Sequence, residues 1–258
     1  MTDHDSNRFA GKRAIVTGAG AGIGRATALQ LLAEGARVGL IGWHREKVEA
    51  VAAQSACPDN ALALQADCAD EASISAAIDE AARAFGGLDI VVSNAGVEYE
   101  SLEHRVDQTD LDVWQRLIHN NLDGQFLTCK HGIRHLLAAG GGAVVCLGSN
   151  VAYLGMAKGE PAYCASKGGI LAMMRQMAID YVRDNIRVNM VVPGLIDTQM
   201  NAPLHEDPEE MAYWVDQVPM GRAGTAEECA SAICWLASDE ASYCCGTALV
   251  VDGGQASL

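Results

Sequence analysis

The sequence has 258 residues, a length that fits one large domain or two small ones. Half of the residues are hydrophobic and a fifth are charged, which excludes an intrinsically disordered chain. Acidic residues outnumber basic residues by 33 to 18, and the formal net charge is −15. This balance argues against a nucleic-acid partner and against binding to an anionic membrane surface, because both need a basic footprint.

The first ten residues are polar and partly acidic, and no apolar stretch follows them, so we expect no signal peptide. No run of about 18 apolar residues occurs, so we expect no membrane span. The nine cysteines are odd in number and form no Cys-x-x-Cys pair. Free thiols of this kind indicate a reducing compartment, and we expect a cytoplasmic protein.

Short β-like runs alternate with longer helical runs along the whole chain. The expected strands are residues 13–17, 36–41, 61–65, 88–92, 143–147, 186–192 and 247–251. The expected helices are residues 22–34, 46–55, 71–85, 110–139 (as one or two helices), 161–183 and 225–238. Because the strands are almost continuously apolar, both of their faces must be buried, which indicates a parallel sheet with helices on each side. Residues 1–258 are therefore predicted to form one doubly wound α/β domain.

The first strand runs into a glycine-rich turn with the sequence TGAGAGIG at residues 17–24. Gly18, Gly22 and Gly24 come just before and at the start of the next helix. Glycine at these positions lets the backbone approach a pyrophosphate, whose charge the helix N-terminus favours. A tight turn without a ligand is the alternative.

Tyr163 and Lys167 are four residues apart on an expected helix, so they share one face. An ammonium about one helical turn away is expected to lower the pKa of the phenol, which can then exchange a proton with an alcohol or carbonyl. Ser149 follows an apolar strand, at the sheet edge where α/β proteins bind ligands. The alternative for Tyr163 and Lys167 is an ordinary solvent-exposed pair on a helix. The alternative for Ser149 is an ordinary turn serine.

These motifs together resemble the classical short-chain dehydrogenase/reductase family. The resemblance extends from residue 11 to residue 254. It rests on the TGxxxGxG turn, Asn94-Ala95-Gly96, Asn121 in Asn-Leu-Asp-Gly, Ser149, Tyr163-x-x-x-Lys167 and Pro193-Gly194. The family resemblance implies a Rossmann-like fold and NAD(P)-dependent oxidoreduction of alcohols and carbonyls.

The resemblance also implies a role for each catalytic candidate. Tyr163 would be the acid/base, and Ser149 would position the substrate oxygen. Lys167 would tune Tyr163 and bind the nicotinamide ribose. Asn121 would kink its helix and hold the water of a proton relay, with a simple local bend as the alternative.

Cofactor contacts are implied in the same way. The pyrophosphate would meet the glycine turn, and Asp67 would accept from the adenine amine, unless it is only a helix N-cap. The full predicted set is Gly18, Gly22, Ile23, Gly24, Trp43, Asp67, Cys68, Asn94, Ala95, Gly96, Tyr163, Lys167, Pro193, Gly194, Ile196 and Thr198. NAD-specific relatives carry an acid where this chain has Gly42, and NADP-specific relatives carry Arg where it has Trp43. The choice between NAD and NADP therefore stays open.

The segment 197–224 is long, acidic and without clear periodicity, and we expect a lid or substrate loop there. Its apolar side chains would form one wall of the pocket, and Tyr153 and Met156 would form the other. These side chains are Met200, Leu204, Met211, Tyr213 and Trp214. The expected substrate is a small, neutral, mainly apolar secondary alcohol or ketone.

Two alternatives remain at this point. One is a 3-oxoacyl-carrier-protein reductase, although this chain has Leu127 and Ile179 where such relatives commonly carry Arg. The other is a cofactor-binding regulatory protein without catalysis.

His131 and His135 are spaced i, i+4, but no third ligand is evident, so we expect no metal site. The family resemblance further implies a homotetramer or homodimer, with a cofactor half at about 11–96 and a substrate half at about 97–258.

Overall fold

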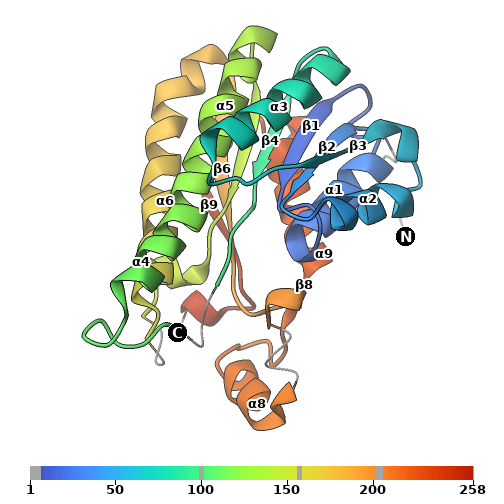
Figure 1. The fold of residues 1–258 in the computed structure, drawn as a ribbon. Coiled ribbons are helices and arrows are strands. Elements are labelled where there is room, and N and C mark those ends of the chain that lie inside the picture. The colour runs from blue at the N-terminus through green and yellow to red at the C-terminus, as the bar shows by residue number, and fades with distance from the viewer. Residues whose placement is uncertain (1–6, 99–101, 156–158, 202–205, 258) are drawn as a thin grey trace.

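The computed structural model describes residues 7–98, 102–155, 159–201 and 206–257. Within them, seven parallel strands form one sheet in the order β3-β2-β1-β4-β5-β6-β9 (Figure 1). The strands are β1 (Arg13–Thr17), β2 (Arg37–Gly42), β3 (Ala61–Gln65), β4 (Ile90–Ser93), β5 (Gly142–Leu147), β6 (Ile186–Pro193) and β9 (Ala248–Val251). The predicted doubly wound parallel sheet is confirmed, because the order runs outward in both directions from β1 and β4.

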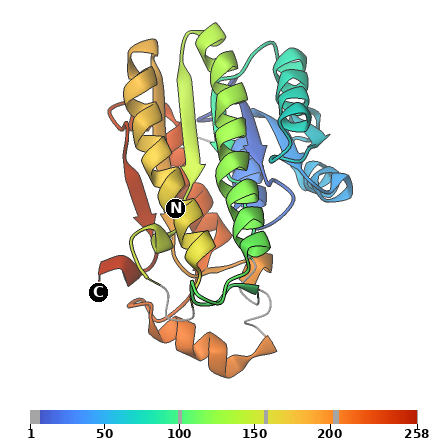
Figure 2. The ribbon, with the colours of Figure 1, turned by 60° about the vertical axis from the view of Figure 1, so that its left-hand side comes forward.

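Helices cover both faces of this sheet (Figures 1 and 2). One layer holds α1 (Gly22–Ala33), α2 (Arg45–Gln54) and α9 (Ala226–Ala237). The other holds α3 (Glu71–Phe85), α4 (Leu111–Leu117), α5 (Gly124–Ala139) and α6 (Pro161–Tyr181). Successive residues of β1 point into the two different cores: Ile15 packs with α3, whereas Ala14 and Val16 pack with α1 and α9. Burial on both faces is the reason that the strands read as continuous apolar runs.

Helix ends follow local capping chemistry. The Thr225 side chain accepts the N–H of Glu228, and the Glu228 carboxylate accepts the N–H of Thr225, which forms a capping box at the start of α9. Asp70, rather than Asp67, caps α3 by accepting the N–H of Ser73. Short 3₁₀ turns lie at Pro58–Asn60, Asn150–Ala152, Val182–Asp184, Gln199–Asn201, Asp239–Ala241 and Gln255–Ser257.

The segment that follows β6 is more regular than the sequence suggested. It begins with β7 (Ile196–Asp197), which pairs in parallel with β8 (Gly224–Thr225), and between them lies α8 (Pro208–Asp216). Asp207 caps α8 by accepting two backbone N–H groups, and Pro208 occupies the first helical turn, where no N–H is needed. The expectation of an irregular segment was therefore wrong. Its helix lies apart from the two main layers, below the carboxyl edge of the sheet (Figures 1 and 2).

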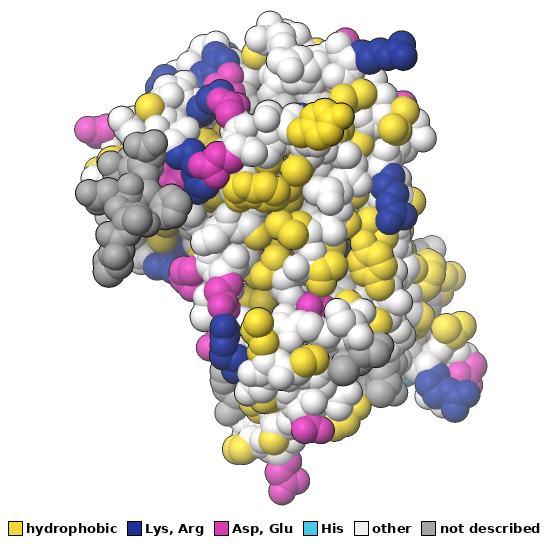
Figure 3. Space-filling model, turned by 180° about the vertical axis from the view of Figure 1, so that it is seen from behind, with side chains coloured by type: hydrophobic (Ala, Val, Ile, Leu, Met, Phe, Trp, Pro, Cys, Tyr) yellow, Lys and Arg dark blue, Asp and Glu magenta, His cyan; other side chains and the backbone are white. Residues whose placement is uncertain are grey.

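Hydrophobic side chains also reach the surface. Phe126, Ile179 and Val182 are exposed on or next to α5 and α6. Tyr243 and Val250 are exposed just before and within the edge strand β9, which pairs with β6. Figure 3 shows hydrophobic side chains gathered across the middle of the face that lies behind Figure 1. No helix in the described ranges is long and apolar enough to cross a bilayer.

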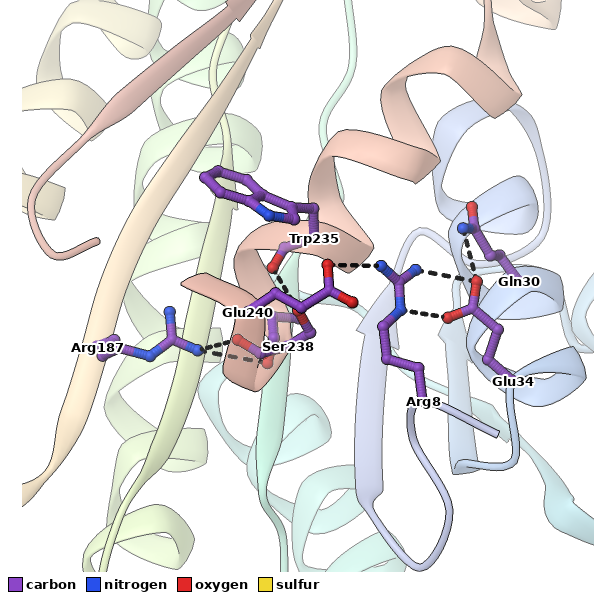
Figure 4. Close-up of polar contacts among 8 residues, drawn as sticks. Arg8, Gln30, Glu34, Arg187, Trp235, Ser238 and Glu240 are labelled. Atoms are coloured by element: carbon purple, nitrogen blue, oxygen red, sulfur yellow. Dashed lines mark hydrogen bonds and ion pairs between the residues drawn. The ribbon is translucent and has the colours of Figure 1, made fainter. Parts of the chain in front are cut away.

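Two arginines tie the amino-terminal edge of the sheet together (Figure 4). The Arg8 guanidinium bonds the Glu34 carboxylate at the end of α1, with an Nε–Oε2 distance of 2.6 Å, and pairs with Glu240 at 3.7 Å. Arg187, on β6, donates to the carbonyl oxygens of Leu236 and Ser238 at 2.8 Å each, at the carboxyl end of α9. These contacts stabilise the amino-terminal edge of the sheet. The cleft described below lies at the other edge, at the carboxyl ends of the strands.

Candidate active site

A cleft of about 270 Å³ lies at the carboxyl ends of β1, β4, β5 and β6. Its lining brings together fourteen of the predicted residues, from segments far apart in the sequence. These are Gly18, Gly22, Ile23, Gly24, Asn94, Ala95, Gly96, Ser149, Tyr163, Lys167, Pro193, Gly194, Ile196 and Thr198. Four predicted residues do not line this cleft, namely Trp43, Asp67, Cys68 and Asn121.

The glycine turn is packed too closely for side chains. A Cβ on Gly24 would lie 2.5 Å from the Nδ2 atom of Asn94, and one on Gly18 would lie 2.7 Å from the same atom. Asn94 fixes this arrangement by donating from Nδ2 to the carbonyl oxygen of Thr17 at 2.8 Å. On the outer side, a Cβ on Gly22 would touch Thr198 at 3.4 Å, so the turn and the segment after β6 face each other across the cleft.

These features fit a dinucleotide cofactor. The turn leads directly into the N-terminus of α1, where backbone N–H groups and the helix dipole favour a pyrophosphate. The Oδ1 atom of Asn94 is buried and has no hydrogen-bond partner among the described residues. A buried acceptor of this kind is costly unless a ligand or water satisfies it.

The residues that were predicted to meet the adenine end of the cofactor follow the neighbouring strands β2 and β3. Trp43 follows β2 with 59% of its surface exposed, and its carbonyl oxygen accepts a hydrogen bond from Gln65 at the end of β3. The Asp67 side chain accepts the N–H of Ala69 at 2.9 Å and closes a turn before α3. Burial and the charge of Asp67 raise the pKa of the Cys68 thiol to about 12, so this thiol stays protonated. The alternative of Asp67 as the N-cap of α3 was wrong, and its contact with adenine stays a prediction.

Tyr163 and Lys167 lie on the inner face of α6, as the i, i+4 spacing predicts. The Lys167 Nζ atom is 5.4 Å from the centre of the Tyr163 ring and donates to the carbonyl oxygen of Leu147 at 3.4 Å. Ser149 follows β5, its hydroxyl accepts the N–H of Val151 at 3.4 Å, and it lines the cleft together with Tyr163. Hydroxyl, phenol and ammonium therefore stand at one end of the cleft.

Electrostatics differ from the sequence expectation at Tyr163. Burial, with the negative charge of Glu98 as the next contribution, raises the pKa of this phenol, and the neighbouring Ser149 hydroxyl only partly offsets the rise. Burial also lowers the pKa of Lys167 to about 8. The expectation that the Tyr163 pKa falls was wrong for the chain alone, because desolvation disfavours both the phenolate and the ammonium. A neutral phenol is the form that donates a proton to a carbonyl.

Asn121 lies close to Lys167, in a π-helical turn (Ile118–Asp123) between α4 and α5. Its amide donates to the carbonyl oxygen of Val97 at 2.8 Å and accepts the N–H of Val97 at 2.7 Å. A Cβ on Gly96 would lie 3.3 Å from the Asn121 oxygen and 3.5 Å from the Lys167 ammonium, so the two groups are neighbours. A π-helical turn thus interrupts the helix at Asn121, and the kink and the relay water stay predictions.

Sequence reasoning missed three carboxylates close to the catalytic helix. Glu98 and Glu160 line the cleft itself. Glu103 is only 2% exposed and accepts the N–H groups of Ala162 at 2.7 Å and Tyr163 at 3.2 Å, in the first turn of α6. The proximity of Glu160 to Tyr163 in the sequence was the one signal available, since Glu98 and Glu103 are about 60 residues away along the chain.

We expect that Glu103→Ala destabilises the start of α6 and displaces Tyr163. Loss of a helix cap typically costs about 0.5–2 kcal/mol, and about 1–3 kcal/mol when buried N–H groups are left unpaired. Thermal unfolding should therefore occur at lower temperature, with a parallel fall in turnover. Glu103→Gln keeps one acceptor oxygen and should lose less of both. Equal unfolding temperatures for the wild type and Glu103→Ala would contradict this role.

Apolar side chains line the cleft on the side of the segment 197–224. Met200 and Trp214 contribute from this segment, and Leu195 precedes it. Trp214 is buried, whereas Tyr213 is exposed and Tyr153 does not reach the cleft. Met211 is likewise absent from the lining. Leu204 and Met156 lie outside the described residues, so their predicted positions are not tested.

The two histidines on α5 each contact a carboxylate of α3. The His131 Nε2 atom is 3.0 Å from Glu71, and the His135 Nε2 atom is 2.7 Å from Asp79. Among the described residues, no group of three or more His, Cys, Asp or Glu side chains is placed to hold a metal ion. The i, i+4 pair thus joins two helices.

Comparison with known proteins agrees with the motifs. A family profile described as Enoyl-(Acyl carrier protein) reductase matches residues 18–256. Cis-4-hydroxycyclohexanecarboxylate dehydrogenase of Sinomonas cyclohexanicum is 41% identical over 97% of this chain and 98% of its own length. The chain belongs to the classical short-chain dehydrogenase/reductase family.

Two further similarities bear on the activity. A 3-oxoacyl-[acyl-carrier-protein] reductase of Salmonella typhimurium is 38% identical over 95% of this chain and 98% of its own length. A gluconate 5-dehydrogenase of Burkholderia cenocepacia, solved with NADP and tartrate, superposes with a TM-score of 0.90 at 32% identity and covers 98% of both chains. This member of the family is thus an NAD(P)-dependent oxidoreductase that acts on CH–OH groups.

Proposed function

We propose that this protein transfers hydride between a nicotinamide cofactor and a small, neutral, mainly apolar secondary alcohol or ketone. The bound cofactor supplies the hydride or accepts it. Tyr163 exchanges the proton with the substrate oxygen, and Ser149 positions that oxygen. Lys167 binds the nicotinamide ribose and tunes Tyr163, and Asn121 holds the relay water.

The observation that carries the proposal is the placement of Tyr163, Ser149 and Lys167 at one end of the cleft whose other end is the glycine turn. A substrate oxygen can meet both hydroxyls there, within reach of a cofactor that follows the turn. The apolar wall formed by Met200 and Trp214 supports a mainly apolar substrate.

The test is turnover with NADH and NADPH against a panel of cyclic, steroidal, sugar and aryl ketones, with an acyl-carrier thioester as a further member. Highest efficiency with a free ketone supports the proposal. Highest efficiency with the thioester would favour the alternative activity of a 3-oxoacyl-carrier-protein reductase. Similarity to the Salmonella reductase is the reason to test this alternative. Cofactor binding without any turnover would favour the non-catalytic regulatory protein.

Gly42→Asp is expected to shift cofactor preference towards NAD. A carboxylate at the end of β2 would accept from the ribose diol and repel a 2′-phosphate, so the ratio of KM for NADPH to KM for NADH should rise at least about tenfold. Because a Cβ at this position would lie 2.9 Å from Val48, the fold is checked by thermal unfolding. An unchanged ratio in a folded variant would show that residue 42 does not face the ribose.

The segment 197–224 is proposed to close over the substrate as a lid. It joins the body through the short β7–β8 pair, and two of its residues, Met200 and Trp214, line the cleft. Limited proteolysis should cut this segment more slowly in the presence of NAD(P)⁺ and a substrate alcohol, because closure protects the backbone. Equal cleavage rates with and without these ligands would contradict the lid.

A homotetramer or homodimer and a cytoplasmic location complete the proposal. The exposed apolar side chains on α5 and α6, and those near the edge strand β9, support association of copies through these two surfaces. All nine cysteines are free, which suits a reducing compartment. The cofactor half is assigned to about 11–96 and the substrate half to about 97–258.

A further inference from the structure

Two amide side chains meet at the end of the cleft that holds Ser149 and Tyr163. Asn150 directly follows Ser149, and Gln255 begins the short 3₁₀ turn after β9. The Asn150 Nδ2 atom donates to the Gln255 Oε1 atom at 2.8 Å, across 105 residues of chain. Both residues line the cleft together with Tyr163. The pair therefore brings further polar groups to the place where the substrate is expected to lie.

The turn after β9 holds Gln255 in place. The Asp252 carboxylate accepts the N–H groups of Gly254 at 2.9 Å and Ala256 at 2.6 Å, on either side of Gln255. Asp252 itself is buried. A Cβ on Gly194 would lie 3.1 Å from the Gln255 Oε1 atom, so this amide also lies close to the end of β6. The surrounding structure thus preorganises the amide pair, as a specific binding site requires.

Each amide keeps one group that forms no bond with the protein. An amide side chain has an oxygen that accepts and an NH₂ group that donates. The bond between the pair uses the Asn150 NH₂ group and the Gln255 oxygen, and no described residue bonds the Asn150 Oδ1 atom or the Gln255 Nε2 atom. In the described chain, the buried side-chain polar atoms without a partner belong to Ser93, Asn94 and Gln125, so both amide atoms are in contact with solvent. Because both side chains line the cleft, one acceptor and one donor are available there to a ligand.

A hydroxyl group is the small neutral ligand that suits both of these atoms. Its hydrogen can be donated to the Asn150 Oδ1 atom, and its oxygen can accept from the Gln255 Nε2 atom. An ether oxygen can use only the donor, and a methyl group can use neither atom. A site built to bond a hydroxyl discriminates against an apolar analogue, because the analogue displaces water and leaves the polar atoms of the site unpaired.

We propose that the Asn150–Gln255 pair recognises a hydroxyl group of the substrate, on a carbon other than the one that is oxidised or reduced. The proposal rests on the proposed function and specifies the substrate class as a hydroxy ketone or the corresponding diol. The two catalytic hydroxyls meet the reacting oxygen, and the apolar wall of Met200 and Trp214 is left for the hydrocarbon part. One additional hydroxyl keeps the substrate small, neutral and mainly apolar.

The test uses cyclohexanones that carry a hydroxyl, a methoxy or a methyl group, each at ring position 2 or position 4. Their kcat/KM values are measured for the wild type, Asn150→Leu and Gln255→Met, which replace each amide with an apolar group of similar size. Gln54→Met is the matched control, because Gln54 is exposed on α2, accepts a hydrogen bond from Arg25 and does not line the cleft. Calorimetry with the NAD(P)⁺-saturated protein measures binding of the same ketones, including any that are not turned over.

In the wild type, the hydroxyl compound should exceed the methyl compound about five- to hundredfold at one ring position or both, the range given by two neutral hydrogen bonds. The methoxy compound should lie between them. Gln255→Met should bring the hydroxyl and methoxy compounds closer to the methyl compound. Asn150→Leu should also remove the difference between hydroxyl and methoxy, which depends on the acceptor. Gln54→Met should keep the wild-type ratios. Ratios are compared because Asn150 adjoins Ser149, so that absolute rates can change for every compound.

Four results would overturn the proposal. The first is a wild type that shows no preference for the hydroxyl over the methyl compound at either position, in turnover and in binding. The second is a loss in both cleft variants that is equal for all compounds, which indicates that the pair only supports the loop of Ser149. The third is a change confined to KM for the cofactor, which would assign the pair to the nicotinamide. The fourth is an equal change of the ratios in Gln54→Met. Binding with the expected ranking but without any turnover would instead count against the proposed function.

Discussion

Replacing Tyr163 with Phe should abolish turnover while the cofactor still binds. The substitution removes one hydroxyl from a residue that is buried against the core of α4 and α6, so the packing is kept. Loss of a general acid or base typically lowers the rate by about 10²- to 10⁴-fold. We expect the phenol to be the proton donor in the cleft, since the Lys167 Nζ atom lies 5.4 Å from the centre of its ring and the Ser149 hydroxyl lines the same cleft.

The measurement is a single-turnover rate with a substrate that the wild type reduces, together with titration of NADPH or NADH by fluorescence. Phe9→Leu, a change in the buried core at the opposite edge of the sheet, controls for a general loss of stability. Retention of more than about a tenth of the wild-type chemical rate in Tyr163→Phe would contradict the assignment. Loss of cofactor binding in the same variant would show that the phenol mainly shapes the cleft.

Most of the fold follows from local patterns in the sequence. The apolar runs of β1 and β6 are buried on both faces of the sheet. A continuous apolar composition predicts this burial, and so these strands could be located from the sequence. Helix starts were found where short-range chemistry marks them, as at Thr225 and Pro161. The α8 helix was missed because its amphipathic stretch is only nine residues long and lies between acidic, irregular segments.

The candidate site also has a part that could be predicted from local sequence patterns and a part that depends on tertiary structure. Gly18, Ser149 and Tyr163 follow strand ends or share a helix face, so their convergence at one sheet edge could be predicted. The burial of Tyr163 could not be predicted from the spacing of Tyr163 and Lys167. For this reason the predicted direction of the Tyr163 pKa shift was wrong. Glu103 illustrates the same limit, because its contact with the first turn of α6 spans about 60 residues of chain and depends on tertiary structure.

Gly24→Ala is expected to disable the cofactor site through a single methyl group. A Cβ on Gly24 would lie 2.5 Å from the Asn94 Nδ2 atom and closer still to the carbonyl oxygen of Gly18. Both partners are fixed, since Gly18 belongs to the turn backbone and Asn94 is held by hydrogen bonds with Thr17. The turn must therefore move outward, into the space that faces Thr198 across the cleft.

A displacement of about 1 Å in a site of this kind can cost about 10²-fold in efficiency, so kcat/KM for the cofactor should fall by that order. The fall should appear mainly in KM for NADH or NADPH, because the glycine turn lies at the end of the cleft away from Tyr163. Gly155→Ala is the matched control, since Gly155 is exposed and an added Cβ there meets no atom within 4 Å. If Gly24→Ala binds the cofactor as tightly as Gly155→Ala does, then the pyrophosphate does not lie on this turn.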